Sequence, residues 1–200
     1  MGSKSTSRAF PGFDKLFYLG ESGSSRAFRG DVPVETNAVA LTRAELQPAL
    51  PLSVDWAMGS AKPGEVIWTT MGTMVIVAEP VVQLLRAKGF TGWSLYPAAI
   101  RDKQGQPVPG YSGLAFTGRC GDIDKARSVQ VPRIRPAGIF PAWKGLFFDP
   151  TSWDGSDLFM PGGPVGWKLV VEEVKRAFEQ ARIRNVEFTP LDQLEVDWPR

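Results

Sequence analysis

Two segments of the chain share a pattern of apolar and polar positions that predicts strand, helix, strand. In the first segment, apolar runs between residues 66 and 77 predict two short β-strands. Glu79 and Pro80 then predict the start of a helix, because proline is tolerated in the first turn and a carboxylate is favourable at the positive end of the helix dipole. The helix should end at Gly89, and an extended segment should follow up to Pro97.

The second segment lies 93 residues further along, the offset that aligns Pro97 with Pro190. Other identities under this offset are Val77 with Val170, Glu79 with Glu172, and Val81 with Val174. Val174, Ala177, Phe178 and Ala181 have the i, i+3, i+4, i+7 spacing of one apolar helix face. The pattern indicates either a structural repeat or two unrelated units with similar packing requirements.

These patterns predict an α+β fold in which a mixed, mainly antiparallel sheet carries two main helices on its face. The helices should cover about 80–88 and 172–182 and bury their apolar stripes, including Phe178. The expected organisation is a flexible N-terminus (1–12), an N-terminal subdomain (13–60) and an α+β core (61–200) with two repeat-like strand–helix–strand units (64–100 and 155–194).

The remaining segments predict shorter elements. Thr42 could cap a short helix that ends before Pro48. The expected strands and connections are a strand at 13–19, a hairpin pairing 93–100 with 111–118, a strand at 128–134, a proline-containing connection at 135–144, a buried strand at 145–149 and a last strand or turn at 191–198.

Composition excludes several classes of protein. The chain is 43% hydrophobic and 22% charged, which is typical of a folded domain. Its net charge is +2, and the sequence shows no cluster of basic residues that would predict the basic face of a nucleic-acid-binding protein. No apolar run is long enough for a membrane span, and no secretory signal is visible at the N-terminus. We therefore expect a cytoplasmic protein that binds neither nucleic acid nor membrane.

The segment from Thr117 to Asp124 is the best candidate for an enzyme site. Cys120 lies beside Arg119 between two glycines, where Arg119 could lower the pKa of the thiol, and Asp122 and Asp124 follow. However, the chain has no histidine, so the commonest partner for activating a thiol is missing. A tight turn around a half-buried thiol is the alternative interpretation.

Three carboxylates in the segment DPTSWDGSD invite a calcium interpretation, but Asp149, Asp154 and Asp157 do not have the spacing of an EF-hand loop. Asp-Pro and Asp-Gly are also common turn formers. We expect turns here, and neither a metal nor a cofactor.

Two of the seven tryptophans, Trp143 and Trp153, lie in loops rich in proline and glycine. An indole in such a loop is a typical interface anchor, and packing within the loop or the core is the alternative. The residues expected to contact a partner are therefore Trp143, Trp153, Asp154, Asp157, Arg119 and Asp122.

An apolar strand followed by VAE (77–79) or VVE (170–172), a helix, and then GFTGWSLYP or RIRNVEFTPL resembles immunity proteins of bacterial polymorphic toxin systems, most closely the group in myxobacteria and their relatives. The phrase YSGLAFTGRCGDID is similar to a segment in uncharacterised proteins of that group, and the likeness covers about 64–200. Some of those proteins carry paired C-x-x-C zinc knuckles, from which this chain departs with its single cysteine. The resemblance implies toxin binding and supplies no catalytic residues.

Three functions follow from these observations. The leading hypothesis is a non-enzymatic immunity protein that binds and neutralises a cognate toxin domain encoded nearby. A thiol-dependent enzyme centred on Cys120, or a structural or regulatory interaction module, are the alternatives.

Overall fold

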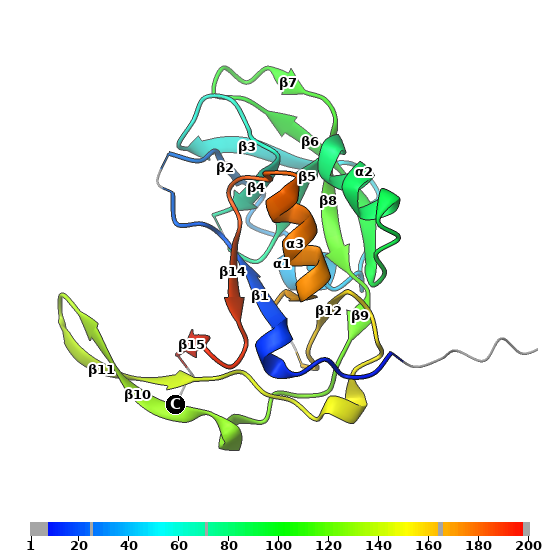
Figure 1. The fold of residues 1–200 in the computed structure, drawn as a ribbon. Coiled ribbons are helices and arrows are strands. Elements are labelled where there is room, and N and C mark those ends of the chain that lie inside the picture. Colours follow the sequence, from blue (N-terminus) through cyan, green and yellow to red (C-terminus); the bar gives the residue numbers. More distant parts are fainter. Residues whose placement is uncertain (1–7, 25, 71, 164–165, 198–200) are drawn as a thin grey trace, which may run out of the picture.

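The computed structural model describes residues 8–24, 26–70, 72–163 and 166–197. Over these residues the chain forms a mixed α/β fold made mostly of strands, with three α-helices (Figure 1). The strands form a closed six-stranded barrel and two open sheets, and most pairings are antiparallel. The prediction of a mixed, mainly antiparallel α/β arrangement is confirmed, whereas the single sheet that we expected is divided into three. None of the helices in the described part is long and apolar enough to cross a membrane.

Six strands close the barrel. In order they are β3 (Leu52–Met58), β2 (Arg29–Asp31), β4 (Val66–Thr69), β5 (Val75–Ala78), β8 (Tyr111–Phe116) and β6 (Trp93–Arg101). Parallel pairing of β3 with β6 completes the circle, and β7 (Pro107–Val108) folds back on β6. The predicted hairpin is confirmed, because β6 and β8 pair in antiparallel register from Trp93 opposite Phe116 to Pro97 opposite Ser112.

Strands β4 and β5 are apolar at every position except Thr69, because each is buried on both faces. Ile67 and Ile76 belong to the core inside the barrel, whereas Trp68 and Val77 belong to the larger core outside it. Helix α1 (Ala38–Thr42) contributes to the inner core. Its N-cap is Asn37, whose side chain accepts a hydrogen bond from Ala40 N, so the prediction that Thr42 caps a helix was wrong.

The second sheet is open and has five strands. Their order is β14 (Glu187–Pro190), β1 (Leu16–Gly20), β13 (Leu169–Val171), β12 (Leu158–Met160) and β9 (Gly118–Arg119). Helices α2 (Glu79–Ala87) and α3 (Glu172–Gln180) add their apolar faces to the core shared by this sheet and the barrel. Leu85 of α2 and Phe178 of α3 are 0% and 1% exposed, so both predicted helices bury their stripes as expected.

The two strand–helix–strand segments match in detail under the 93-residue offset. The helices begin at Glu79 and Glu172 and end at Ala87 and Gln180. In both segments a third strand lies antiparallel between the two strands that flank the helix: β8 between β5 and β6, and β1 between β13 and β14. Positive φ values recur at equivalent turn positions: 68° and 55° at Gly89 and Arg182, and 83° and 62° at Gly92 and Asn185.

The N-terminal third is shared between both large sheets. Strand β1 lies in the five-stranded sheet, and β2 and β3 lie in the barrel, so residues 13–60 do not form a sheet of their own. Residues 1–7 of the expected flexible N-terminus lie outside the described residues. Phe10, which is described, packs against the main core.

A third, three-stranded sheet projects from the body (Figure 1). It consists of β10 (Val129–Arg135), β11 (Gly138–Lys144) and β15 (Glu195–Val196). Elsewhere in the described residues, 3-10 turns cover Phe13–Lys15, Lys125–Arg127 and Pro150–Ser152. Strands β10 and β15 were predicted, but 135–144 is not a connection, since most of it is β11. Residues 145–149 are not a strand either: Leu146 and Phe148 are buried, but the only ladder contact described there is a bridge from Phe148 to Ile123.

Candidate functional site

The predicted site residues fall into two groups. Arg119 and Asp154 lie together, because Arg119 N donates to Asp154 Oδ2 at 2.7 Å and Asp154 N donates to Arg119 O at 3.1 Å. Trp143 belongs to the projecting sheet instead. The residues expected to contact a partner therefore lie in two separate regions.

Cys120 does not have the environment of a catalytic thiol. It is 5% exposed, and burial raises its pKa to about 12, with Asp154 adding to the increase and Arg43 opposing it. Raising the pKa depletes the thiolate, which is the nucleophilic form. The expectation that Arg119 lowers this pKa was wrong.

The guanidinium of Arg119 is occupied by the backbone. Its Nη1 donates to the carbonyls of Phe116 and Gly118 at 2.7 and 2.8 Å, and its Nη2 donates to the carbonyl of Arg43. Burial, with repulsion from Arg43, lowers the pKa of Arg119. Its role in the structure is to join the end of β8 to the segment after α1.

The three aspartates of the 149–157 segment stabilise turns. Asp149 accepts from Thr151 N at 2.9 Å and Thr151 Oγ1 at 2.8 Å, hydrogen bonds that lower its pKa. Asp154 also accepts from Ser156 N at 2.9 Å. No group of three metal-binding side chains is present among the described residues.

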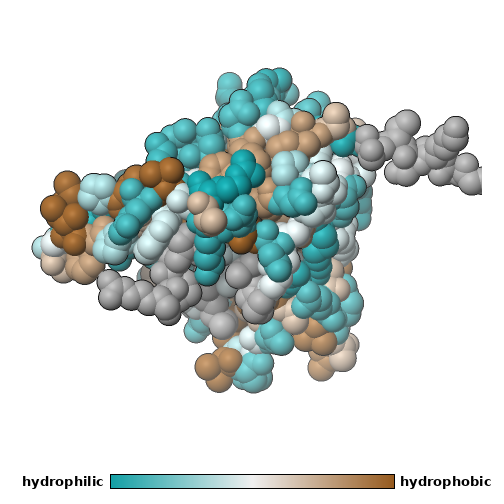
Figure 2. Space-filling model, turned by 90° about the horizontal axis from the view of Figure 1, so that it is seen from below, coloured by the Kyte–Doolittle hydropathy of each residue, from teal (hydrophilic) through white to brown (hydrophobic). Residues whose placement is uncertain are grey.

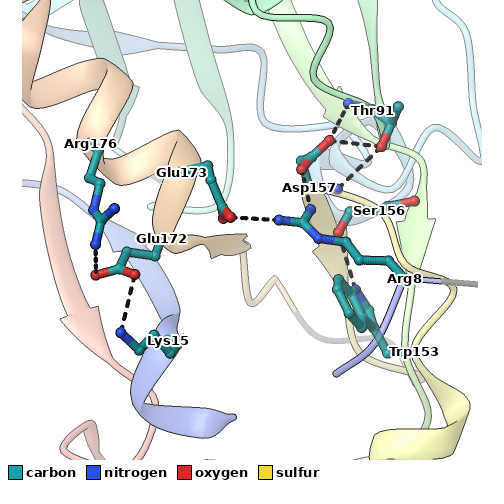
Figure 3. Close-up of polar contacts among 9 residues, drawn as sticks. All are labelled: Arg8, Lys15, Thr91, Trp153, Ser156, Asp157, Glu172, Glu173 and Arg176. Atoms are coloured by element: carbon teal, nitrogen blue, oxygen red, sulfur yellow. Dashed lines mark hydrogen bonds and ion pairs between the residues drawn. The ribbon is translucent and has the colours of Figure 1, made fainter. Parts of the chain in front are cut away.

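Of these three aspartates, Asp157 forms contacts to the most distant parts of the chain (Figure 3). It accepts from Thr91 N at 2.8 Å, from Thr91 Oγ1 at 2.9 Å and from Arg8 Nη1 at 2.5 Å. Arg8 also pairs with Glu173 of α3 at 2.9 Å. These contacts hold the N-terminal segment against the loop that carries Trp153.

Trp153 is buried, contrary to its predicted role as a surface anchor. It is 8% exposed, it donates to Ser156 O at 3.1 Å, and its ring lies 6.0 Å from Phe10 and 5.8 Å from Phe159. Arg8 lies 5.8 Å from the ring centroid and contributes to its cover. No local sequence pattern indicates that the N-terminal segment covers this indole.

The remaining predicted residues, Asp122 and Asp124, are exposed on the same loop. Asp122 lies against Gly162, where a Cβ atom would meet Asp122 Oδ1 at 2.2 Å. Asp124 accepts from Ala126 N and begins the 3-10 turn. Neither carboxylate forms a site with Cys120.

The surface that remains for docking is the hairpin of β10 and β11, which we call the arm (residues 129–144). It carries four of the eight exposed large apolar side chains among the described residues: Val129 at 65%, Ile134 at 82%, Ile139 at 70% and Phe140 at 42%. Figure 2 shows hydrophobic surface along this projecting part of the molecule. A hollow of about 470 Å³ on the arm is lined by Gln130, Val131, Pro132, Ile139, Phe140 and Pro141.

The register of the arm places its two most exposed apolar residues, Ile134 and Ile139, on one face, and Val129 and Phe140 on the other. Ile134 lies opposite Ile139, Pro132 opposite Pro141, and Gln130 opposite Trp143. Because side chains alternate along a strand, these three pairs share a face, which we call the outward face. Trp143, half-buried against the main core, is at the base of this face, so one predicted anchor does adjoin the exposed surface.

The two prolines protect the edges of the arm. Proline has no N–H, so the Pro132–Pro141 pair can occupy only a non-hydrogen-bonded site, in which the backbone groups point away from the partner strand. The outer edges of β10 and β11 therefore each lack a backbone N–H donor at the position of the proline. Such an edge resists the addition of a further strand, and docking through side chains is favoured instead.

On the other face of the arm, ion pairs join β10 to β15 and the residue after it. Arg133 Nε lies 3.2 Å from Glu195 and Nη1 lies 3.1 Å from Asp197, and Arg135 lies 2.6 Å from Asp197. These arginines are neutralised within the chain, so the arm is not a free basic patch. No protein-family model matches the chain, and no curated protein matches it either.

Proposed function

We propose that this chain is a non-enzymatic binding protein that docks on another protein through the outward face of the arm. The observation that carries the proposal is the facing pair Ile134 and Ile139, which are 82% and 70% exposed on a hairpin that leaves the body. Contiguous exposed apolar surface marks sites of protein interaction. Burying each isoleucine would contribute about 1.5–3 kcal/mol.

We further propose that the partner is a bacterial toxin domain encoded beside the gene for this chain, and that the chain neutralises it in the cytoplasm. The support is the resemblance to immunity proteins. In this chain, the VAE and VVE motifs that carry the resemblance lie at the starts of α2 and α3. The chain acts by covering the active site of the toxin or a surface near it. The internal pairing of Arg133 and Arg135 with carboxylates is consistent with a protein partner rather than a nucleic acid.

The finer description of the fold is also a proposal. The common order, register and turn conformations of 65–97 and 157–190 support two copies of one unit, with the central strand supplied by β8 in one copy and by β1 in the other. In this description the two units form a rigid scaffold, and the arm is the added element. A scaffold of this kind suits a binding protein, since it fixes the base of the docking hairpin.

Co-expression tests the proposal. The toxin domain from the neighbouring gene should arrest growth, and co-expression of the wild-type chain should restore it. A chain with Ile134→Lys and Ile139→Lys should keep its melting temperature and lose the rescue. The matched control is Val34→Lys in the loop between β2 and α1, which changes a 94% exposed apolar residue away from the arm and should rescue normally.

Two outcomes count against the proposal. Failure of the wild-type chain to rescue cells from a verified toxin would contradict the immunity function. Capture of a set of structural proteins from the native cell through the same arm would favour the structural or regulatory module instead.

A further inference from the structure

A separate cavity of about 530 Å³ lies between three loops that are far apart in the sequence. The loops are those at 22–28, 60–66 and 184–185. In Figure 1, β14 runs from the turn that carries the third loop down towards β15, so the cavity is at the other end of β14 from the base of the arm. Its volume is in the range of small-molecule sites.

The walls of this cavity are fixed by hydrogen bonds. Asn185 Nδ2 donates to Val66 O at 3.0 Å, Asn185 Oδ1 lies 3.3 Å from the Ser22 hydroxyl, and Trp68 Nε1 donates to Asn185 O at 2.7 Å. Ser60 N donates to Arg26 O at 2.9 Å. The left-handed turn at Asn185, with φ 62°, therefore ties all three loops together.

The cavity is lined by an excess of positive charge. Arg26, Lys62 and Arg184 contribute one cation from each loop, and Glu65 is the one carboxylate among the lining residues. Among the described residues, none of these three cations forms an ion pair, in contrast to the paired arginines of the arm. Hydroxyls of Ser22, Ser24 and Ser60 complete the polar lining.

The equivalent place in the other half of the molecule is filled by the chain itself. Ala78 N donates to Glu65 O at 2.9 Å, and in the same way Val171 N donates to Asp157 O at 3.0 Å. Glu65 therefore corresponds to Asp157. By the 93-residue offset, Arg184 corresponds to Thr91. Thr91 and Arg8 bind Asp157 directly and close that gap (Figure 3). At Glu65 the gap stays open, and Arg26, Lys62 and Arg184 are among the residues that line it.

We propose that this cavity binds a small phosphorylated molecule. Phosphate groups match a cavity lined by three cations and neighbouring hydroxyls, because each phosphate oxygen can accept charge-assisted hydrogen bonds. A single carboxylate would leave part of this charge uncompensated. The proposal is independent of the toxin-binding function, since it uses none of the arm residues.

Calorimetric titration of the full chain with inorganic pyrophosphate and with citrate tests this site. Pyrophosphate should bind saturably at a ratio of one to one and more weakly as salt rises from about 0.05 to about 0.3 M. Lys62→Gln with Arg184→Gln should weaken binding by about tenfold or more for each cation removed. Arg86→Gln with Lys88→Gln, which removes the same charge from α2 and the residue after it, should leave the affinity unchanged.

Several results would overturn the proposal. These are the absence of saturable pyrophosphate binding, equal weakening by the two double variants, or citrate binding as tightly as pyrophosphate. The melting temperature of each variant shows whether a loss of binding comes from a loss of fold, and Arg26→Gln alone provides a second, independent variant of the site.

Discussion

Lys168 is a buried cation whose titration should be visible in the stability of the whole protein. It is 1% exposed, and its ammonium donates to the carbonyls of Gly166, Thr73 and Gly72 at 3.0, 3.1 and 3.4 Å. The ammonium also lies 5.2 Å from the ring of Trp68. Burial lowers the pKa of Lys168 from 10.5 to about 8.

The sign of the effect follows from proton counting. Below about pH 8 the lysine is protonated in both the folded and the unfolded chain, and the cost of burying the charge is fully present. Between pH 8 and 10.5 the unfolded chain binds more protons than the folded one, so the free energy of unfolding rises with pH. From pH 7 to pH 9.5 the increase from this group should be about 2 kcal/mol.

Cys120 opposes this trend, because its raised pKa makes the folded protein lose stability above about pH 9. Comparison with Lys168→Met removes that contribution, since both proteins contain the cysteine. Urea unfolding followed by tryptophan fluorescence would give both free energies across this pH range. The wild-type value minus the variant value should rise by about 2 kcal/mol from pH 7 to pH 9.5. A flat or falling difference would refute the reasoning, and the exposed-lysine control Lys88→Met should follow the wild type.

Three further predictions concern packing and reactivity. Phe178→Ala should lower the free energy of unfolding by about 3–5 kcal/mol in a urea titration, whereas the exposed Glu179→Ala should change it by less than about 0.5 kcal/mol; equal effects would contradict the placement of α3. Tyr96→Phe should leave the melting temperature unchanged or raise it, because the buried hydroxyl has no hydrogen-bond partner among the described residues, whereas Gly113→Ala should lower it, since a Cβ there would lie 1.9 Å from the Tyr96 ring. The Cys120 thiol should resist alkylation at about pH 8 until urea unfolds the chain, and rapid labelling of the folded protein would show that the thiol is accessible.

The helices could be predicted because their signals are local. Glu79 with Pro80, and Glu172 with the apolar spacing up to Phe178, fix the start and the buried face of each helix within a few residues. The closure of the barrel could not be predicted, since the parallel pairing of β3 with β6 joins residues more than forty positions apart, such as Leu52 and Ala98.

The second strand of the arm, β11, was missed because Pro136 and Pro141 made 135–144 resemble an irregular connection. Pro132 and Pro141 face each other at a non-hydrogen-bonded site, so neither removes a ladder hydrogen bond, and only the register reveals this. For Trp153 the sequence left contact with a partner and packing in the core both open, and the structure shows packing. Its cover comes from Phe10 and Arg8, about 140 residues away in the sequence, and no local pattern predicts such a contact.

The affinity of the purified chain for a catalytically inactive form of the neighbouring toxin domain tests the central claim most directly. Isothermal calorimetry should give tight one-to-one binding for the wild type and for Val34→Lys. The double variant Ile134→Lys and Ile139→Lys should bind more weakly by about 100-fold or more, at an unchanged melting temperature, because two buried anchors are lost and two charges are placed in the interface. Wild-type affinity in the folded double variant would contradict docking through the arm.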